Sequence, residues 1–286
     1  MTVALLLTLK LAVGLLIFAI GLGSTLQDLT YLWRRPGLMI RSLVAMYIIV
    51  PAIAFAMVKV LDLPLAVSAA LLVLAVSAGA PLLPRKLSSF GDAAYVFSLT
   101  VTSSLLAVVL VPTWVALLSR HFHVSTELPP SVVAAAIAKS FFLPLVIGMI
   151  VRAAWLTDRG DRVADRLIKL GGLAMTIAGV LLLVLHWDIL PKMGWRAMST
   201  LVALMLAALV TGHLLGGPKE DGRTALGIAC ATRHVGVAVL VATSFPGPQT
   251  SVLIAAYVVA AAAVSIPYLR WRRRVALRHE LGAAAA

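Results

Sequence analysis

The residues of this sequence that are best suited to chemistry are polar side chains inside long apolar runs. Arg233 and His234 follow Thr232 within the apolar run 224–245. An arginine at the depth of a bilayer costs about 3 kcal/mol or more unless it faces a cavity or a partner. We therefore predict that Arg233 binds an anionic group, with Thr232 and His234 beside it. The alternative is an arginine near a span boundary whose side chain reaches the membrane interface.

A second polar interruption falls in the apolar run 65–83. Its end, and the residues that follow, contain two prolines, a glycine and two cations between residues 77 and 86. Backbone groups inside a membrane can leave a helix only where protein or a water-filled cavity satisfies them, and transporters use such breaks as binding sites. We therefore assign Ser77 and Gly79 to the binding site and place Arg85 and Lys86 at its cytoplasmic mouth. The alternative is a span that simply stops at a proline-rich loop.

The charges inside the apolar runs are cations. Lys139 lies midway along the run 131–155, and we add it to the candidate binding residues. His213, late in the run 201–215, is better explained as a packed, hydrogen-bonded side chain. All eleven acidic residues fall outside or at the edges of the apolar runs. A carboxylate or sulfonate on a solute would supply the countercharge that Arg233 lacks, since a guanidinium binds such groups at two points.

The elements that must position these residues are membrane-spanning helices. The chain is 62% apolar and 12% charged, whereas soluble domains are roughly half apolar and a quarter charged. Cys230, the single cysteine, excludes an internal disulfide and a cysteine-based zinc cluster. The first run is expected to be a retained span because it lacks the features of a signal peptide. Hydropathy predicts nine spans, at 3–26, 38–61, 65–83, 93–118, 131–155, 168–186, 201–215, 224–245 and 251–269.

Basic residues are distributed unevenly over the predicted loops. One side of the membrane has seventeen lysines and arginines, including those of the tail 270–286, and the other side has four. Positive charge stays in the cytoplasm, so we expect an inner-membrane protein with its N-terminus outside and its C-terminus cytoplasmic. The net charge of +13 is explained by these loops, and nucleic acid is not an expected partner.

Several short motifs along the chain resemble those of the bile acid:sodium symporter family, and the resemblance covers nearly the whole length. They are Gly21-Leu22-Gly23-Ser24-Thr25-Leu26, Arg35-Pro36, Pro51, Gly91-Asp92, Thr100, Lys139 with Phe142-Leu143-Pro144, and Gly236. The resemblance implies an all-α polytopic membrane protein with two inverted repeats, at 3–118 (lacking its first helix) and 131–269. It further implies a panel domain, a core domain, and discontinuous third and eighth spans that cross at the substrate site, with Thr100 nearby.

This sequence departs from the family where sodium would bind. The resemblance places the sodium ligands of coupled members at Met46, Leu82, Leu83, Ala229 and Arg233, of which the first four are apolar here. Sodium requires several oxygen ligands and no adjacent fixed cation. We therefore expect transport without sodium.

The leading hypothesis is a secondary transporter of a small organic anion that works by uniport, exchange or proton coupling through His234. A conventional sodium symporter is the alternative within the same class. From other classes, an intramembrane enzyme would need a nucleophile with a base or a metal cluster, and the known sequence motifs for these do not occur. A non-transporting receptor is the remaining alternative. No metal or cofactor is predicted.

Overall fold

The described part of the protein is built from helices. The computed structural model describes residues 2–77, 93–122, 130–155, 159–185, 187–234, 238 and 249–284, and this part of the chain contains no strand. In chain order its elements are α1 (Thr2–Leu22), α2 (Leu26–Thr30), α3 (Pro36–Val44), the π-helix η1 (Ala45–Ile49), α4 (Val50–Leu61), α5 (Leu65–Val76), α7 (Ala93–Phe122), α8 (Pro130–Trp155), α9 (Gly160–Leu185), α10 (Ile189–Leu215), α11 (Glu220–Ala231) and α13 (Gln249–Ala284).

Several helices have the length and apolar composition of membrane spans. Five meet both criteria in the described residues, and two further apolar helices, Lys10–Leu22 and Leu65–Val76, are shorter. Large apolar side chains lie exposed along α8, among them Leu143, Val146 and Ile150, as expected of a helix that faces lipid rather than water. The chain is thus an all-α, multi-pass membrane protein, and the count of nine spans stays a prediction.

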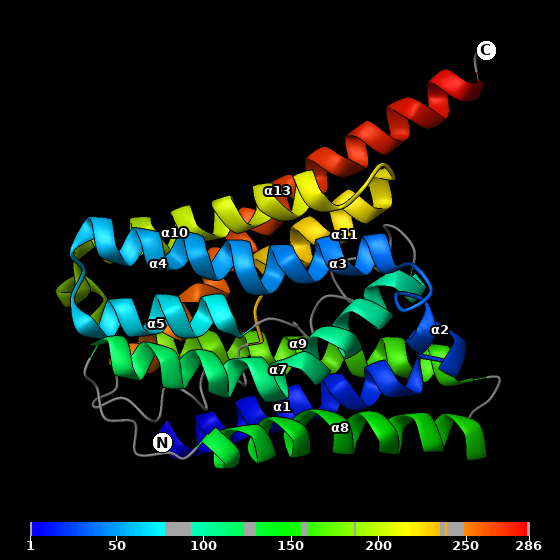
Figure 1. Cartoon of the computed structure of the whole chain (residues 1–286). Coiled ribbons are helices and arrows are strands. Elements are labelled where there is room, and N and C mark those ends of the chain that lie inside the picture. Colours follow the sequence, from blue (N-terminus) through cyan, green and yellow to red (C-terminus); the bar gives the residue numbers. More distant parts are fainter. Residues whose placement is uncertain are drawn as a thin grey trace.

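Several helix boundaries differ from the predicted spans: α9 and α10 begin at Gly160 and Ile189, well before the predicted 168 and 201, and other helices end inside an apolar run or continue past it. Helix α5 ends at Val76 and α11 at Ala231, well before the ends of their apolar runs. Helix α13 continues to Ala284 through the basic tail, because arginine, alanine and leucine favour helix. Its C-terminal half projects from the rest of the molecule (Figure 1).

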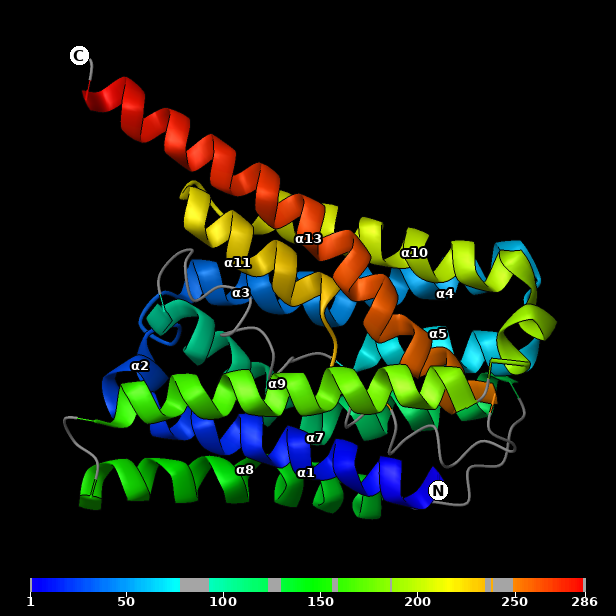
Figure 2. The same cartoon turned by 180° about the vertical axis from the view of Figure 1, so that it is seen from behind.

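Helix α1 lies between α8 and α9 and packs against both (Figures 1 and 2). The α1–α8 contact is unusually close because glycines face the partner backbone. A Cβ on Gly21 would collide with the Leu145 carbonyl, and one on Gly148 would collide with the Phe18 carbonyl. Small residues are the usual means by which membrane helices bring their backbones together.

The remaining long helices form a second group, in which α10 packs on α4, α11 and α13, and α5 packs on α4 and α13. The short helix α2 connects the two groups. Its end is tied to α7 by two hydrogen bonds, from the Leu32 N–H to Ser98 Oγ at 2.9 Å and from Trp33 Nε1 to Thr102 Oγ1 at 3.1 Å. Inside the second group the C-terminal ends of α5 and α11 meet, and there the candidate site is found.

Candidate functional site

The two predicted interruptions lie side by side in the structure. Ser77 leaves the helical conformation directly after α5, and Thr232 is extended directly after α11. The His234 N–H donates a hydrogen bond to the Ser77 carbonyl at 2.9 Å. Two chain segments that lie about 155 residues apart in the sequence are therefore joined by a backbone hydrogen bond.

Side-chain hydroxyls add to the last turn of each helix. Ser77 Oγ donates to the Val73 carbonyl at 2.7 Å, and Thr232 Oγ1 donates to the Ile228 carbonyl at 2.6 Å. The backbone N–H groups of Ser77 and Thr232 donate to the same two carbonyls. The carbonyls that follow at each helix end have no partner within the helix and need another donor.

Tyr257 of α13 holds the extended segment in place. Its hydroxyl accepts a hydrogen bond from the Arg233 N–H and donates one to the Ala231 carbonyl at 3.0 Å. The ring is almost fully buried. A single phenol thus replaces two backbone interactions that the chain loses when α11 ends.

The backbone carbonyl of Met46, a residue of the π-helix η1, faces the Arg233 side chain. In a π-helix each N–H bonds the carbonyl five residues earlier, as the Val50 N–H does to Ala45. The next donor in this register would be residue 51, which is proline and has no N–H. The Met46 carbonyl is left without that donor, and Arg233 Nη1 lies 3.5 Å from it, a long hydrogen bond.

The Arg233 guanidinium is buried without a countercharge in the described part of the chain. The residue is 5% exposed. No acidic side chain among the described residues forms an ion pair with it, and within the same residues its Nη2 has no hydrogen-bond partner. An isolated buried cation is costly unless a partner compensates it. The site is therefore electrostatically incomplete.

The space beside Arg233 is small in this structure. A cavity of about 10 Å³, enough for roughly one water molecule, lies against Arg233 and Tyr257 and is otherwise lined mostly by apolar side chains, including Leu74 and Met205. As lined by the described residues, this cavity is too small for an organic solute.

Lys139 is not part of this group of residues. Phe141, two positions further along α8, is buried with its ring centroid 6.2 Å from that of His234. Residues two apart on a helix point in nearly opposite directions. Lys139 is accordingly exposed on the other face of α8, away from His234, and its assignment to the site stays a prediction.

The other predicted residues have distinct outcomes. Thr100 is fully buried in α7, where its hydroxyl donates to the Val96 carbonyl at 2.8 Å. His213 is bonded through Nδ1 to the Tyr268 hydroxyl at 2.8 Å, which confirms a packed role. Gly79, Arg85 and Lys86 lie outside the described residues, so their roles stay predictions.

Sequence reasoning missed Tyr257 and Phe141, which both reach the interruption from other helices. Tyrosine in an apolar run was the available signal for the first, because a buried phenol hydroxyl needs a partner. No signal in the sequence marked the second.

A helical chain with several apolar spans, in which two helix ends meet around a buried cation, has the architecture of a secondary membrane transporter. The family comparison agrees with this class. The Sodium Bile acid symporter family matches residues 10–186, more than half of the chain, and the protein belongs to that family. The match includes Met46, Ser77 and Thr100 and stops before Arg233. No curated protein matches the chain.

Proposed function

We propose that this protein is a sodium-independent secondary transporter of a small organic anion, which binds through a carboxylate or sulfonate to Arg233. The observation that carries the proposal is the buried guanidinium with an unpartnered Nη2 and no carboxylate beside it in the described residues. An anion bound in two places would supply the missing charge and hydrogen bonds together.

We infer from the atoms that surround Arg233 that sodium coupling is absent. Family resemblance places sodium ligands at Met46, Ala229 and Arg233. In the structure Met46 and Ala229 are buried apolar side chains, and the Met46 carbonyl is already approached by Arg233 Nη1. A guanidinium in this place repels a second cation, so the fixed charge of Arg233 takes the role that a bound sodium ion has in coupled relatives.

The closed cavity fits an alternating-access cycle. Binding an anion to Arg233 would leave the pair electrically neutral, and a neutral buried pair costs less to carry through an apolar interior than either ion alone. In this proposal Thr232 and His234 contact the solute from the extended segment, Ser77 and Gly79 from the end of α5, and Thr100 from α7. The transport mechanism is then proton coupling through His234, uniport or exchange.

The proposal keeps the predicted topology. In this topology the protein has nine spans in two inverted repeats, at 3–118 and 131–269, and a basic tail at the cytoplasmic C-terminus. Helices α1, α8 and α9 would form the panel domain and the remaining long helices the core. Arg85 and Lys86 would lie at the cytoplasmic mouth.

The test is uptake of labelled organic anions into proteoliposomes that contain the purified protein. A panel of carboxylates and sulfonates is offered with sodium, with choline in its place, and with an imposed pH gradient. We expect uptake of at least one anion without sodium, and we expect Arg233→Ala to abolish that uptake while Arg233→Lys restores only part of it.

Arg196→Ala is the matched control, because Arg196 is an exposed arginine of α10 and its loss removes the same charge elsewhere. Uptake that requires sodium would favour the conventional symporter. Transport by Arg233→Ala at the parent rate would refute the binding role. Specific binding of an anion with no transport would favour the receptor alternative.

A further inference from the structure

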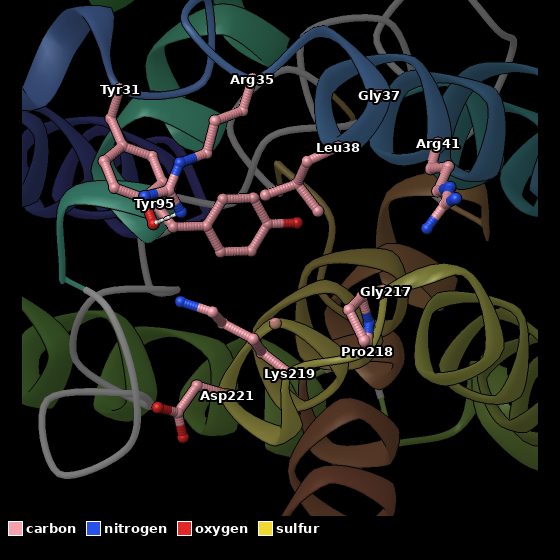
Figure 3. Close-up of a pocket in the computed structure, with 12 residues that line it drawn as sticks. Tyr31, Arg35, Gly37, Leu38, Arg41, Tyr95, Gly217, Pro218, Lys219 and Asp221 are labelled. Carbon is pink, nitrogen blue, oxygen red and sulfur yellow. Dashed lines mark hydrogen bonds between the residues drawn. The ribbon is translucent and has the colours of Figure 1, made fainter.

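A second cavity, separate from Arg233, lies where the start of α3 approaches the turn between α10 and α11. Its volume is about 580 Å³, within the range of small-molecule sites. Tyr31, Arg35, Arg41 and Tyr95 come from one wall, and Lys219 and Asp221 come from the other (Figure 3). The walls combine the ends of α3, α7 and α11 with the turns that precede α3 and α11, and the distribution of basic residues assigns these turns to the cytoplasmic side.

The walls of this cavity are predominantly positive. Three cations, Arg35, Arg41 and Lys219, line it with one acid, Asp221. In the described part of the chain none of the three cations forms an ion pair. Arg35 is oriented by Tyr31, with its guanidinium carbon 4.2 Å from the ring centroid. The adjacent Glu220 is engaged elsewhere, by Arg272 and Arg223, so it does not neutralise the cavity.

Backbone geometry adds to the positive potential. Helix α3 begins next to the cavity after Arg35, and α11 begins there after Lys219, and neither has a side-chain cap. Uncapped first-turn N–H groups attract anions. Glycines shape the turn at this wall: Gly217 has a φ of +86°, which a side chain would strain, and Gly222 packs closely on the Gly216 carbonyl, from which a Cβ would lie only 2.6 Å away.

We propose that this cavity binds a phosphate-bearing anion from the cytoplasmic side. Three cations and two uncapped helix starts suit a group with several charged oxygens better than a single carboxylate. The volume leaves room for the molecule that carries the phosphate, which is either the headgroup of an anionic phospholipid or a soluble phosphate ester.

The cavity is connected to Arg233 through two rigid elements. From Pro36 to Met46 the chain rises about 15 Å, and from Glu220 to Ala231 about 17 Å. The walls of the cavity are thus the outer ends of the elements whose inner ends meet at Arg233. A bound phosphate would hold α3 and α11 together at the cytoplasmic end. Binding itself does not depend on the function proposed for Arg233.

Matched pairs of probes test the proposal in dodecyl maltoside, on the full chain. Phosphatidylglycerol is compared with diacylglycerol of the same chains by native mass spectrometry, and glycerol 3-phosphate is compared with glycerol by calorimetry. We expect the phosphorylated member of at least one pair to bind and the other member not to bind. Binding of only the lipid identifies a headgroup site, and binding of the soluble ester identifies a metabolite site.

The double variant Arg41→Gln/Lys219→Gln should bind at least tenfold more weakly, because it removes two exposed cations without breaking an ion pair. Arg34→Gln is the control, since Arg34 is an exposed neighbour that does not line the cavity, and it should stay within twofold of the parent. A charge-conserving variant, Arg41→Lys/Lys219→Arg, should retain binding.

The proposal is overturned if neither phosphorylated probe binds the parent protein, or if the double variant binds as well as the parent. Equal losses in the double and charge-conserving variants would also overturn it, because charge would then not be the cause. Repeating the measurement in Arg233→Ala should give unchanged phosphate binding, so this test can fail or succeed independently of the transport test.

Discussion

Two arginines of this protein are buried to the same extent and surrounded very differently. Arg233 is 5% exposed and Arg272 is 6% exposed. Arg272 forms an ion pair with Glu220, donates through Nε to Thr224 Oγ1 at 2.9 Å, and donates to the Glu220 carbonyl at 3.2 Å. Among the described residues the Arg233 guanidinium has one long hydrogen bond, to the Met46 carbonyl at 3.5 Å.

We propose that the difference separates a structural charge from a functional one. A guanidinium has five N–H donors, and burying it is tolerable when carboxylates, hydroxyls and carbonyls receive them. Arg272 is satisfied in this way and joins α13 to the start of α11. Arg233 lacks such partners among the described residues, and in our proposal a bound anion supplies them. Substitutions at these two positions should consequently differ in kind.

The largest effect is expected from Arg233→Met. Removing one partner of a buried, charge-assisted pair costs about 3 kcal/mol of binding, or more than a hundredfold in affinity. The unliganded protein should be as stable as the parent or more so, because an uncompensated buried charge is lost. Ligand affinity and the unfolding temperature of the detergent-solubilised protein are measured together. A variant that unfolds readily without ligand would show that Arg233 is structural.

Arg272→Met should have the opposite pattern. It leaves Glu220, which is about half exposed, without its main partner, and we expect a loss of about 2 kcal/mol in the free energy of unfolding. Anion affinity should remain within twofold of the parent. Thermal unfolding combined with binding measures both quantities. Weaker anion binding without a loss of stability would abolish the distinction between the two arginines.

Tyr257→Phe tests how the extended segment supports Arg233. The change removes one donor and one acceptor and leaves the Arg233 N–H and the Ala231 carbonyl buried without the hydroxyl, at a cost of about 1 to 2 kcal/mol. We expect lower stability and weaker anion binding, because the guanidinium is positioned by this backbone. Unchanged stability in thermal unfolding would mean that water replaces the hydroxyl.

Replacing sodium by choline at constant pH should have the smallest effect, less than twofold in transport or affinity. Met46 and Ala229 supply no side-chain oxygen, and Arg233 adds a fixed cation. Proteoliposome uptake in the two media is the measurement. A tenfold decrease without sodium corresponds to about 1.4 kcal/mol of coupling and would contradict the assignment of these positions.

The sequence predicted the helices well because apolar runs bounded by charge and proline mark membrane spans. The sequence also located both helix interruptions. The glycine and prolines between residues 77 and 86 marked the one after α5, and Arg233 marked the one after α11. Hydropathy placed the span ends poorly. Helices α5 and α11 end at Val76 and Ala231, inside apolar runs, and a hydropathy average over many residues does not detect such an end.

Other features needed tertiary information. Lys139 was assigned to the site by its depth along the chain, but helical phase turns it away while Phe141 turns inward. The π-helix at Ala45–Ile49 has no marker except the following proline, which is also compatible with an ordinary kink. The cavity lined by Arg35 and Lys219 combines two loops that were each recognisably basic, but their joining into one pocket is a property of packing.

The glycine contact between α1 and α8 has a practical consequence for measuring motion. Gly21 and Gly148 bring the two backbones together so closely that neither helix can shift without the other. We expect both to move as one body, with displacement taken up in the short stretch between Leu22 and Leu26. A pair of nitroxide labels, one on an exposed position of α8 such as Leu143 or Ile150 and one on an exposed position of α10 such as Leu214, should therefore report by pulsed electron paramagnetic resonance on the travel of α1 as well.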